Sequence, residues 1–452
     1  MAQKILILGA GRSSAFLIQH LVVHAPTFDA QIMLADASPE VLQAKKAQYP
    51  TLLTFCINIE ETQSLASLLS PGTIVVSLLP AFYQPQVAQL CLSARAHLLT
   101  ASYLPPEMEA LHEAARTQNL LFLNELGLDP GLDHLSACKL LDEIRAEGGI
   151  IDAFRSYAGA LVAPEAEQDN PWSYKFTWNP RNVVLAGQGG PAQYRQDGQT
   201  RLVPAHQLFR RVLPVSVAGA GDFEAYPNRD SLKYAKVYGL ETVPTLLRGT
   251  LRRPGFCQAW HWLVQLGLTD DQVRLPHSES LTYREWLQAF LPDLQANETV
   301  WAALARYCGL STQNPTWAQL AWLELDREQA IGLPQASSAQ ILQKILEGKW
   351  QLQPQDCDMV VMHHEIIYQK EGQRFSRSSD LVVKGAPSPH TAIAKTVGLP
   401  LAMAAVRLAT GQLNLRGVCL PTAPELYLPL LEQLKQVGIR FEESITLLEG
   451  KK

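Results

Sequence analysis

The fold is decided by the stretch Lys4-Ile-Leu-Ile-Leu-Gly9-Ala-Gly11, which runs on into Arg12-Ser-Ser-Ala-Phe-Leu17. Its apolar residues predict a short buried strand, and the glycine-rich turn after them opens a helix at about Ser13. Gly9 permits a tight turn, and Gly11 lets the backbone approach a pyrophosphate, which the N–H groups at the helix start bind. The pattern predicts a dinucleotide site, with an ordinary strand-to-helix turn as the alternative.

The second predicted strand, residues 31–36, ends in Asp36, 27 positions after Gly9. A carboxylate there accepts a hydrogen bond from the 2′-OH of the adenosine ribose and repels a 2′-phosphate, so it favours NAD over NADP. Ser14 stands at the third small position of the turn, where Gly or Ala is usual. We expect the cofactor to be bound here by Gly9, Gly11, Arg12, Ser13, Ser14 and Asp36.

Strands and amphipathic helices alternate through the first third of the chain. Further apolar runs at residues 53–57, 73–77, 97–100 and 120–123 predict strands three to six. This alternation predicts a doubly wound Rossmann sheet, parallel because helices form the crossovers. Ligands of such sheets bind at the carboxyl ends of the strands. There we expect further cofactor contacts from Ser77, Leu78, Leu79, Thr100 and Ala101.

The sixth predicted strand continues into Asn124-Glu-Leu and then Gly127-Leu-Asp129-Pro-Gly131. One interpretation is a tight turn with an Asp cap. The other is a functional turn, because it lies at the carboxyl end of a strand. The sequence pattern leaves both open.

The composition bounds the class of protein. The chain has 452 residues, of which 47% are hydrophobic and 18% charged, enough for two or three folded domains. A net charge of −5 gives no reason to expect nucleic acid or an anionic membrane as a partner, and no apolar run approaches the ~20 residues of a membrane span. The seven cysteines form no Cys-x-x-Cys pair, which predicts reduced thiols and no metal site. The first strand begins too early to leave room for a signal peptide, so we expect a cytoplasmic enzyme.

Residues 150 to about 253 change to short apolar runs joined by Gly, Pro and Asn turns, which predicts a mostly antiparallel sheet. The strands are expected at residues 154–161, 174–178, 201–202, 212–217 and 223–226. Four arginines of this block are candidate clamps for substrate carboxylates, because the planar guanidinium pairs bidentately with a carboxylate. They are Arg181, Arg229, Arg248 and Arg252. Any one alone is better explained by a surface ion pair, but several that converge would not be.

Residues 255–350 are expected to be helical, and we interpret their many tryptophans as core residues. The strand predicted at 358–369 contains His363-His364-Glu365. Neighbours on a strand point to opposite faces, so we do not expect these histidines to share a metal ion.

Two motifs are specific, namely Gly127-Leu-Asp-Pro-Gly-Leu-Asp-His134 and Tyr226-Pro-Asn-Arg-Asp-Ser231. Supporting segments occur in order along nearly the whole chain: Ser77-Leu-Leu-Pro80, Thr100-Ala-Ser-Tyr103, Ala163-Pro-Glu165, residues 170–180, Arg248-Gly-Thr-Leu-Arg252 and residues 394–400. Together they resemble the saccharopine reductases, the glutamate-forming saccharopine dehydrogenases of lysine metabolism.

The resemblance implies an α/β protein with three parts. A Rossmann doubly wound parallel sheet would comprise residues 1–130 and 388–452. An α+β domain for substrate binding and dimerisation, with a mostly antiparallel sheet, would comprise 131–255 and 352–387. A helical domain would be inserted at 256–351. The family likeness also implies a homodimer.

The implied reaction is the reversible condensation and reduction of 2-aminoadipate 6-semialdehyde and glutamate with NAD(P)H to give saccharopine. The family's substrate contacts correspond to Ala101, Ser102, Asp129, Trp178, Arg229, Thr250, Leu251 and Arg252. Arginines would hold the three carboxylates of saccharopine. Asp129, the candidate catalytic residue, would favour the protonated amine, and Trp178 would shield the hydride path from water.

Three features depart from the family pattern. Asp36 favours NAD where many members use NADP, Ala158 stands where a Cys is usual after Ser156-Tyr157, and the helical insert is the least family-like part. Two alternatives therefore stay open. One is a related reductase that joins another amine to an aldehyde, such as carboxynorspermidine dehydrogenase. The other is a non-catalytic nucleotide-binding redox sensor.

Overall fold

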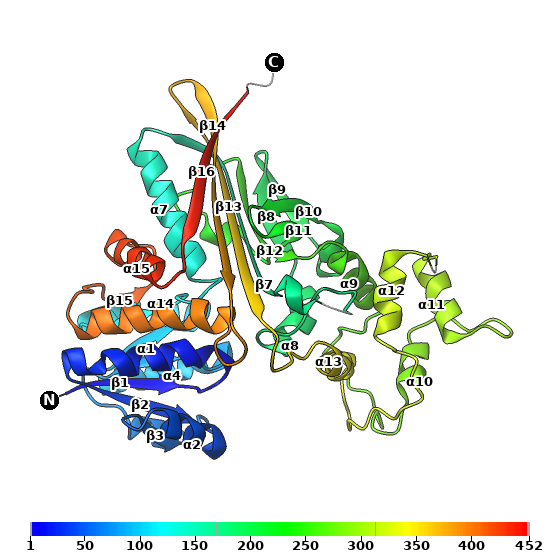
Figure 1. Cartoon of the computed structure of the whole chain (residues 1–452), viewed down its shortest axis with the longest axis horizontal. Coiled ribbons are helices and arrows are strands. Elements are labelled where there is room, and N and C mark those ends of the chain that lie inside the picture. The colour runs from blue at the N-terminus through cyan, green and yellow to red at the C-terminus, as the bar shows by residue number, and fades with distance from the viewer. Residues whose placement is uncertain (1, 168–169, 312, 450–452) are drawn as a thin grey trace. The chain divides into compact units, whose positions relative to one another are not determined.

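The computed structural model describes residues 2–167, 170–311 and 313–449 of the chain (Figure 1). The chain forms two compact units, of which the first comprises residues 1–150 and 381–442 and the second 151–380 and 443–452. The predicted domain boundaries assign α7 (Leu132–Ala146) to the substrate domain, whereas its contacts group it with the first unit.

The first unit contains a seven-stranded sheet in the order β15-β6-β5-β4-β1-β2-β3, and each neighbouring pair is parallel. The strands are β1 (Gln3–Leu8), β2 (Ala30–Asp36), β3 (Leu53–Cys56), β4 (Ile74–Ser77), β5 (His97–Thr100), β6 (Leu121–Leu123) and β15 (Gly417–Cys419). The predicted Rossmann sheet is therefore confirmed, with all six predicted strands in place. The strand β15 was not among them.

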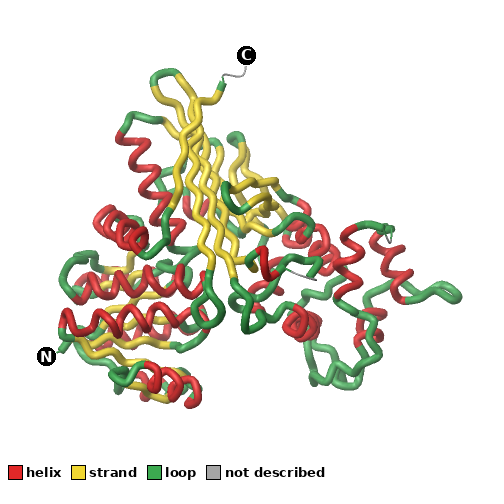
Figure 2. Tube along the Cα trace, viewed as in Figure 1, coloured by secondary structure: helices red, strands yellow, loops and turns green. Residues whose placement is uncertain are grey.

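Helices cover both faces of this sheet (Figure 2). They are α1 (Ala15–His24), α2 (Pro39–Gln48), α3 (Thr62–Ala66), α4 (Gln84–Ala94), α5 (Pro106–Glu109), α6 (His112–Thr117), α7, α14 (Ala392–Ala409) and α15 (Pro424–Gln436). Alternate strand residues, such as Leu6, Val75 and Leu98, form one apolar cluster with α3 to α6. The apolar faces of strands and helices thus close two core layers around the sheet.

The helix α14 lies directly against α1 (Figure 1). A Cβ added to Gly398 would meet the backbone N of Leu17 at 2.9 Å, so the missing side chain permits the close approach of the two helices. By length and composition α14 is apolar enough to span a membrane, but 72% of it is buried inside the structure. Its packing in the core accounts for its composition.

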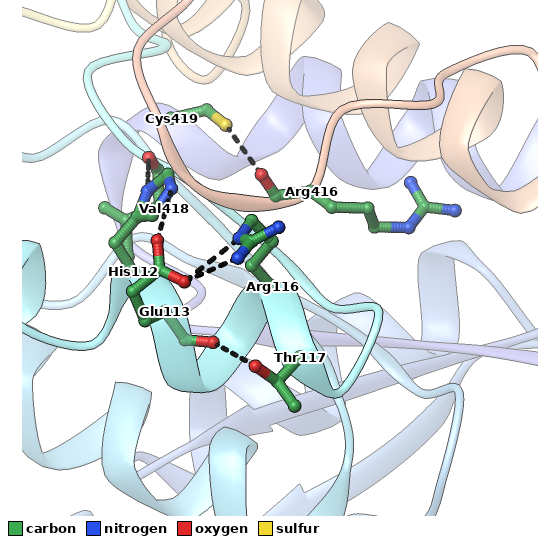
Figure 3. A network of polar contacts seen from close by, with 7 residues as sticks. All are labelled: His112, Glu113, Arg116, Thr117, Arg416, Val418 and Cys419. Atoms are coloured by element: carbon green, nitrogen blue, oxygen red, sulfur yellow. Dashed lines mark hydrogen bonds and ion pairs between the residues drawn. The ribbon is translucent and has the colours of Figure 1, made fainter.

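The strand β15 is fixed at the sheet edge by a network of polar contacts with α6 (Figure 3). Nδ1 of His112 donates to the carbonyl of Val418 at 3.0 Å, and an added Cβ on Gly417 would lie 2.8 Å from the His112 ring. Glu113 and Arg116, one turn apart on α6, form an ion pair at 2.7 Å in the same network. The C-terminal part of the chain thereby completes the sheet that the N-terminal part begins.

The second unit is built on a mixed nine-stranded sheet in the order β10-β11-β12-β7-β13-β14-β16, with β8 and β9 attached beside β12. Its strands are β7 (Ile150–Val162), β8 (Ala192–Gln196), β9 (Gln199–Val203), β10 (Leu213–Val217), β11 (Gly221–Pro227), β12 (Thr245–Arg252), β13 (Asp358–Lys370), β14 (Gln373–Lys384) and β16 (Phe441–Leu448). The pairs β10–β11 and β11–β12 are antiparallel as expected, but β7 and β12 run parallel.

The strand predicted at residues 174–178 is wrong. Only Phe176 makes a single bridge there, with Gln351. The rings of Tyr174 and Phe176 instead pack on Trp350, at centroid distances of 5.1 and 5.3 Å. Aromatic side chains gave this segment a strand-like composition, but tertiary packing decided its conformation.

The other helices of the second unit are α8 (Pro180–Val184), α9 (Phe256–Gln265), α10 (Tyr283–Gln288), α11 (Val300–Cys308), α12 (Pro315–Trp322) and α13 (Ser338–Lys349). The helical character predicted for residues 255–350 is confirmed by α9 to α13. Trp260, Trp286 and Trp350 are fully buried core residues, as predicted, whereas the other four tryptophans of this stretch are only half-buried: Trp262, Trp301, Trp317 and Trp322. The rings of His363 and His364 are separated as expected for strand neighbours: His363 lies 2.6 Å from Asp380, whereas His364 packs on Phe154.

Candidate functional site

The glycine-rich turn has the geometry that a pyrophosphate requires. Gly9 has a φ of 95°, a conformation that other residues rarely adopt, and no atom lies within 4 Å of the place where a Cβ of Gly11 would be. A 3₁₀ turn, Arg12–Ser14, precedes α1, so the α-helix begins at Ala15 rather than at Ser13. The Ser14 hydroxyl donates to the carbonyl of Gly11 at 2.8 Å, which is how a serine fits the crowded third position. The turn therefore fits a dinucleotide pyrophosphate.

Asp36 joins the glycine-rich turn to the end of β2. One carboxylate oxygen accepts the N–H of Ala10 at 2.7 Å, and the other accepts the N–H of Ser38 at 2.9 Å. Each oxygen keeps a further lone pair for a ribose hydroxyl. The next four residues, Ala37-Ser-Pro-Glu40, include no Lys or Arg side chain that could bind a 2′-phosphate.

The remaining predicted cofactor residues lie together at the carboxyl ends of the central strands. Ser77 on β4 is in register with Leu8 of β1 and with Thr100 of β5. Leu78 lies against Gly9, since a Cβ there would meet the Leu78 backbone at 3.6 Å. The Thr100 hydroxyl accepts the N–H of Ser102 at 3.2 Å, so it shapes its own loop.

Residues 127–133 form a tight turn between β6 and α7. The N–H of Gly127 donates to the carbonyl of Pro130 at 2.8 Å, and Gly131 has a φ of 148°. Asp133, the second residue of α7, accepts the N–H of Gly131 at 2.6 Å, and Gly131 itself is the N-cap residue of the helix. The tight turn of the first interpretation is therefore present, and Asp129 is half-buried in it.

The structure brings this turn against the β5 loop. A Cβ on Gly127 would lie 2.9 Å from the Cβ of Ala101, so the two chains are in close contact. Asn124, which lies between β6 and this turn in the sequence, is fully buried. Its Oδ1 has no hydrogen-bond partner among the described residues. Asn124 is not among the site residues predicted from the sequence, although its place at a strand end was a signal that could have found it.

In the second unit the main feature is Arg252, at the end of β12. Its side chain is 4% exposed and lies among the rings of Tyr174, Tyr226 and Phe256, at centroid distances of 5.1, 5.7 and 5.3 Å. One guanidinium nitrogen donates to the carbonyl of Leu251 at 3.0 Å and another to the Tyr226 hydroxyl at 3.4 Å. The rings stabilise the cation by cation–π interactions.

Within the described ranges, no carboxylate forms an ion pair with Arg252, and its Nε has no hydrogen-bond partner. The negative charge of Glu224 stabilises the Arg252 cation only from a distance, and its carboxylate accepts the N–H of Cys257. Burial raises the pKa of the Tyr226 hydroxyl, which therefore stays neutral. A buried cation without a counter-ion is costly, and an incoming anion relieves that cost.

The other three arginines have different surroundings. Arg229 is exposed, has a φ of 44°, and its guanidinium would lie 3.1 Å from a Cβ on Gly189. Arg181 forms an ion pair with Asp271, and Arg248 stacks on the ring of Tyr234 at 4.1 Å. Arg229 and Arg252 therefore remain candidate carboxylate clamps, whereas Arg181 has the structural role of an ion pair.

Of the remaining predicted substrate residues, Trp178 is half-buried beside Tyr174, and Thr250 is half-buried in register with Tyr226. Leu251 is fully buried against Gly159, where an added Cβ would meet its Cβ at 2.9 Å. Its side chain therefore belongs to the core, and only its carbonyl meets the Arg252 guanidinium. Each unit thus carries its own group of candidate residues, with Asp129 and Ser102 in the first.

Family comparisons agree with this geometry. A model described as the saccharopine dehydrogenase NADP binding domain matches residues 5–123, and one described as the saccharopine dehydrogenase C-terminal domain matches residues 127–439. The chain belongs to the saccharopine dehydrogenase family. The resemblance seen in the sequence motifs is thereby confirmed.

Individual members of the saccharopine dehydrogenase family match over nearly the whole chain. Saccharopine dehydrogenase [NADP(+), L-glutamate-forming] of Pyricularia oryzae is 32% identical, over 98% of this chain and 100% of its own length. The mitochondrial alpha-aminoadipic semialdehyde synthase of Mus musculus is 33% identical over 98% of this chain but 48% of its own length, so the chain spans about half of that relative. The apo saccharopine dehydrogenase (L-Glu forming) structure from Saccharomyces cerevisiae has a TM-score of 0.88 and 29% identity, covering 98% of this chain and 100% of that one.

Proposed function

We propose that this protein is an NAD(P)-dependent, glutamate-forming saccharopine dehydrogenase. It interconverts saccharopine with 2-aminoadipate 6-semialdehyde and glutamate, a reaction of lysine metabolism. The observation that carries the proposal is the buried, caged guanidinium of Arg252, which has no carboxylate partner among the described residues. A substrate with three carboxylates supplies the anion that this cation lacks.

The roles follow from the chemistry of each group. The glycine-rich turn and Asp36 would hold the dinucleotide, with Ser77 to Leu79, Thr100 and Ala101 lining the strand ends. When bound, the nicotinamide supplies the hydride chemistry. Arg252 and Arg229 would each hold a carboxylate of saccharopine. Asp129 would favour the protonated secondary amine, and Trp178 would keep water away from the reacting carbon.

We further propose that NAD is preferred over NADP, although the family model and the fungal relatives carry NADP in their names. Asp36 supports this preference, since its negative charge lies where a 2′-phosphate would be placed. Its carboxylate is also fixed by two backbone N–H groups, so it cannot turn away without breaking both bonds. Homodimer formation and a cytoplasmic location stay predictions.

The synthetic direction tests the substrate class. Purified protein would be given 2-aminoadipate 6-semialdehyde, NADH and either glutamate or a diamine, and the products identified by mass. Saccharopine formed only with glutamate is the expected result. A diamine adduct would establish the carboxynorspermidine-type alternative, and dinucleotide binding without any product would favour the sensor.

A further inference from the structure

A buried hydrogen-bonded pair of side chains, Glu125 and His134, flanks in sequence the turn that carries Asp129. Oε2 of Glu125 lies 2.8 Å from Nε2 of His134, and the two side chains are 2% and 0% exposed. Glu125 follows β6 by two residues, and His134 is the third residue of α7. Both belong to the first unit, and neither is among the residues predicted to bind or react.

Glu125 connects three segments. Its second carboxylate oxygen accepts the N–H of Leu104 at 3.0 Å, and its own N–H donates to the carbonyl of Ser102 at 3.1 Å. Through His134 it is also bound to α7, the helix that begins where the Asp129 turn ends. One residue therefore links the loop of Ser102 to the turn of Asp129.

This arrangement is energetically costly. Glu125 has a φ of 55°, in the left-handed region that is unfavourable for residues other than glycine. A carboxylate and an imidazole also lose their hydration, and apolar side chains of similar volume would fill the same space at lower cost. Backbone strain and buried polar side chains that persist together are typical of sites where geometry must be held closely.

We propose that Glu125 and His134 are positioning residues, which hold the Ser102 loop and the Asp129 turn in fixed relation for the reaction. The inference rests on the proposed function. Neither residue is placed in contact with substrate; both act through Ser102 and Asp129. Loosening the pair lets the two segments move independently, so bound substrate is less often aligned, and kcat falls. The glycine-rich turn does not depend on the pair, so dinucleotide affinity persists.

The test compares Glu125→Ala, Glu125→Gln and Tyr427→Phe. Tyr427→Phe is the matched control, because it removes a 2.6 Å hydrogen bond to Asp142 at the other end of α7. For Glu125→Ala we expect saccharopine oxidation with kcat lowered about 10-fold or more and KM for NAD within about twofold. Tyr427→Phe should lower the melting temperature but leave kcat unchanged. Glu125→Gln keeps the shape and an acceptor oxygen, so most of kcat should return.

Wild-type kcat in Glu125→Ala, or an equal loss of kcat in Tyr427→Phe, would overturn the proposal. If Glu125→Ala does not fold, His134→Gln decides, and wild-type kcat in that variant refutes the positioning role. If the wild type oxidises no saccharopine with either dinucleotide, the proposed function fails instead. Hydrogen exchange then tests the pair itself: Glu125→Ala must accelerate exchange in residues 102–104 and in 126–133, and acceleration in only one segment contradicts it.

Discussion

The carboxylate of Asp36 accepts the N–H of Ala10 at 2.7 Å, so the acid that ends β2 is bound to the middle of the glycine-rich turn. The charge expected to select the cofactor is therefore also part of the turn that receives its pyrophosphate. A substitution that separates these two roles must keep the acceptor and remove the charge.

Asp36→Asn removes the charge and keeps one acceptor oxygen, which can retain the bond from Ala10 while the bond from Ser38 is lost. We predict that it shifts cofactor choice toward NADP. Removal of a charge near the 2′-phosphate changes the interaction by about 1–3 kcal/mol, so the NADP/NAD ratio of kcat/KM should rise about 10- to 100-fold. Initial rates with both dinucleotides measure it. Glu40→Gln, an exposed acid on α2, is the control, and a ratio equal in both variants would remove Asp36 from cofactor selection.

Arg252→Met should lower kcat/KM for saccharopine about 100-fold, because a desolvated charge-assisted contact is lost. The melting temperature should stay equal or rise, since the variant removes a buried cation from an aromatic cage. Steady-state rates and thermal melts measure both effects. Arg253→Met is the matched control, because Arg253 follows Arg252 directly in the chain but already has a carboxylate partner, Glu167, at 2.8 Å. A large fall in melting temperature with unchanged KM would show Arg252 to be structural.

Gly189→Ala should raise KM for saccharopine, because its Cβ would lie 3.1 Å from the guanidinium of Arg229. It should also destabilise the fold by about 1–2 kcal/mol, since Gly189 has a φ of 96°. Gly219→Ala, with a φ of 75° and no atom within 4 Å, carries the same kind of strain without the contact. Kinetics and urea unfolding of both variants separate the effects, and an equal KM in the two would exclude a role for the Arg229 position.

The buried His97 should make the folded protein less stable in acid. Burial, with a smaller effect of Arg416, lowers the pKa of His97 to about 4, and its Nδ1 accepts the N–H of Leu121 at 3.0 Å. Between pH 6.5 and 4 the unfolded chain therefore binds the proton and the folded chain does not, so stability falls as the pH falls through this window. The free energy of unfolding, measured with urea, should fall from pH 7 to pH 5. This fall should be about 1–2 kcal/mol smaller in His97→Gln than in the wild type. His277→Gln, at an exposed site, should leave the difference unchanged.

The sequence predicted the Rossmann sheet because its strands are short apolar runs with a helix between each pair. It missed β15 because three residues, Gly417–Cys419, form a strand only through pairing with β6, about 300 positions earlier. Local propensity carries no signal for such a partner. The strand predicted at residues 174–178 failed for the converse reason, since its aromatic side chains pack in a cluster instead of a ladder.

For the candidate site, the sequence predicted the residues at strand ends and the arginines, but not what surrounds them. The cage of Arg252 comes from three separate segments, and only the fold brings Tyr174, Tyr226 and Phe256 around one guanidinium. No rule of sequence spacing predicts the pair of Glu125 and His134. Their side chains meet because Glu125 has a left-handed backbone conformation and His134 lies at the start of a helix.

The most direct measurement is the absorbance of the reduced nicotinamide when purified protein is mixed with saccharopine and either NAD or NADP. We predict that both dinucleotides are reduced, NAD faster than NADP, and that glutamate is a product. Reduction of NADP alone would contradict the role of Asp36, and no reduction of either dinucleotide by a protein that binds them would contradict the proposed function.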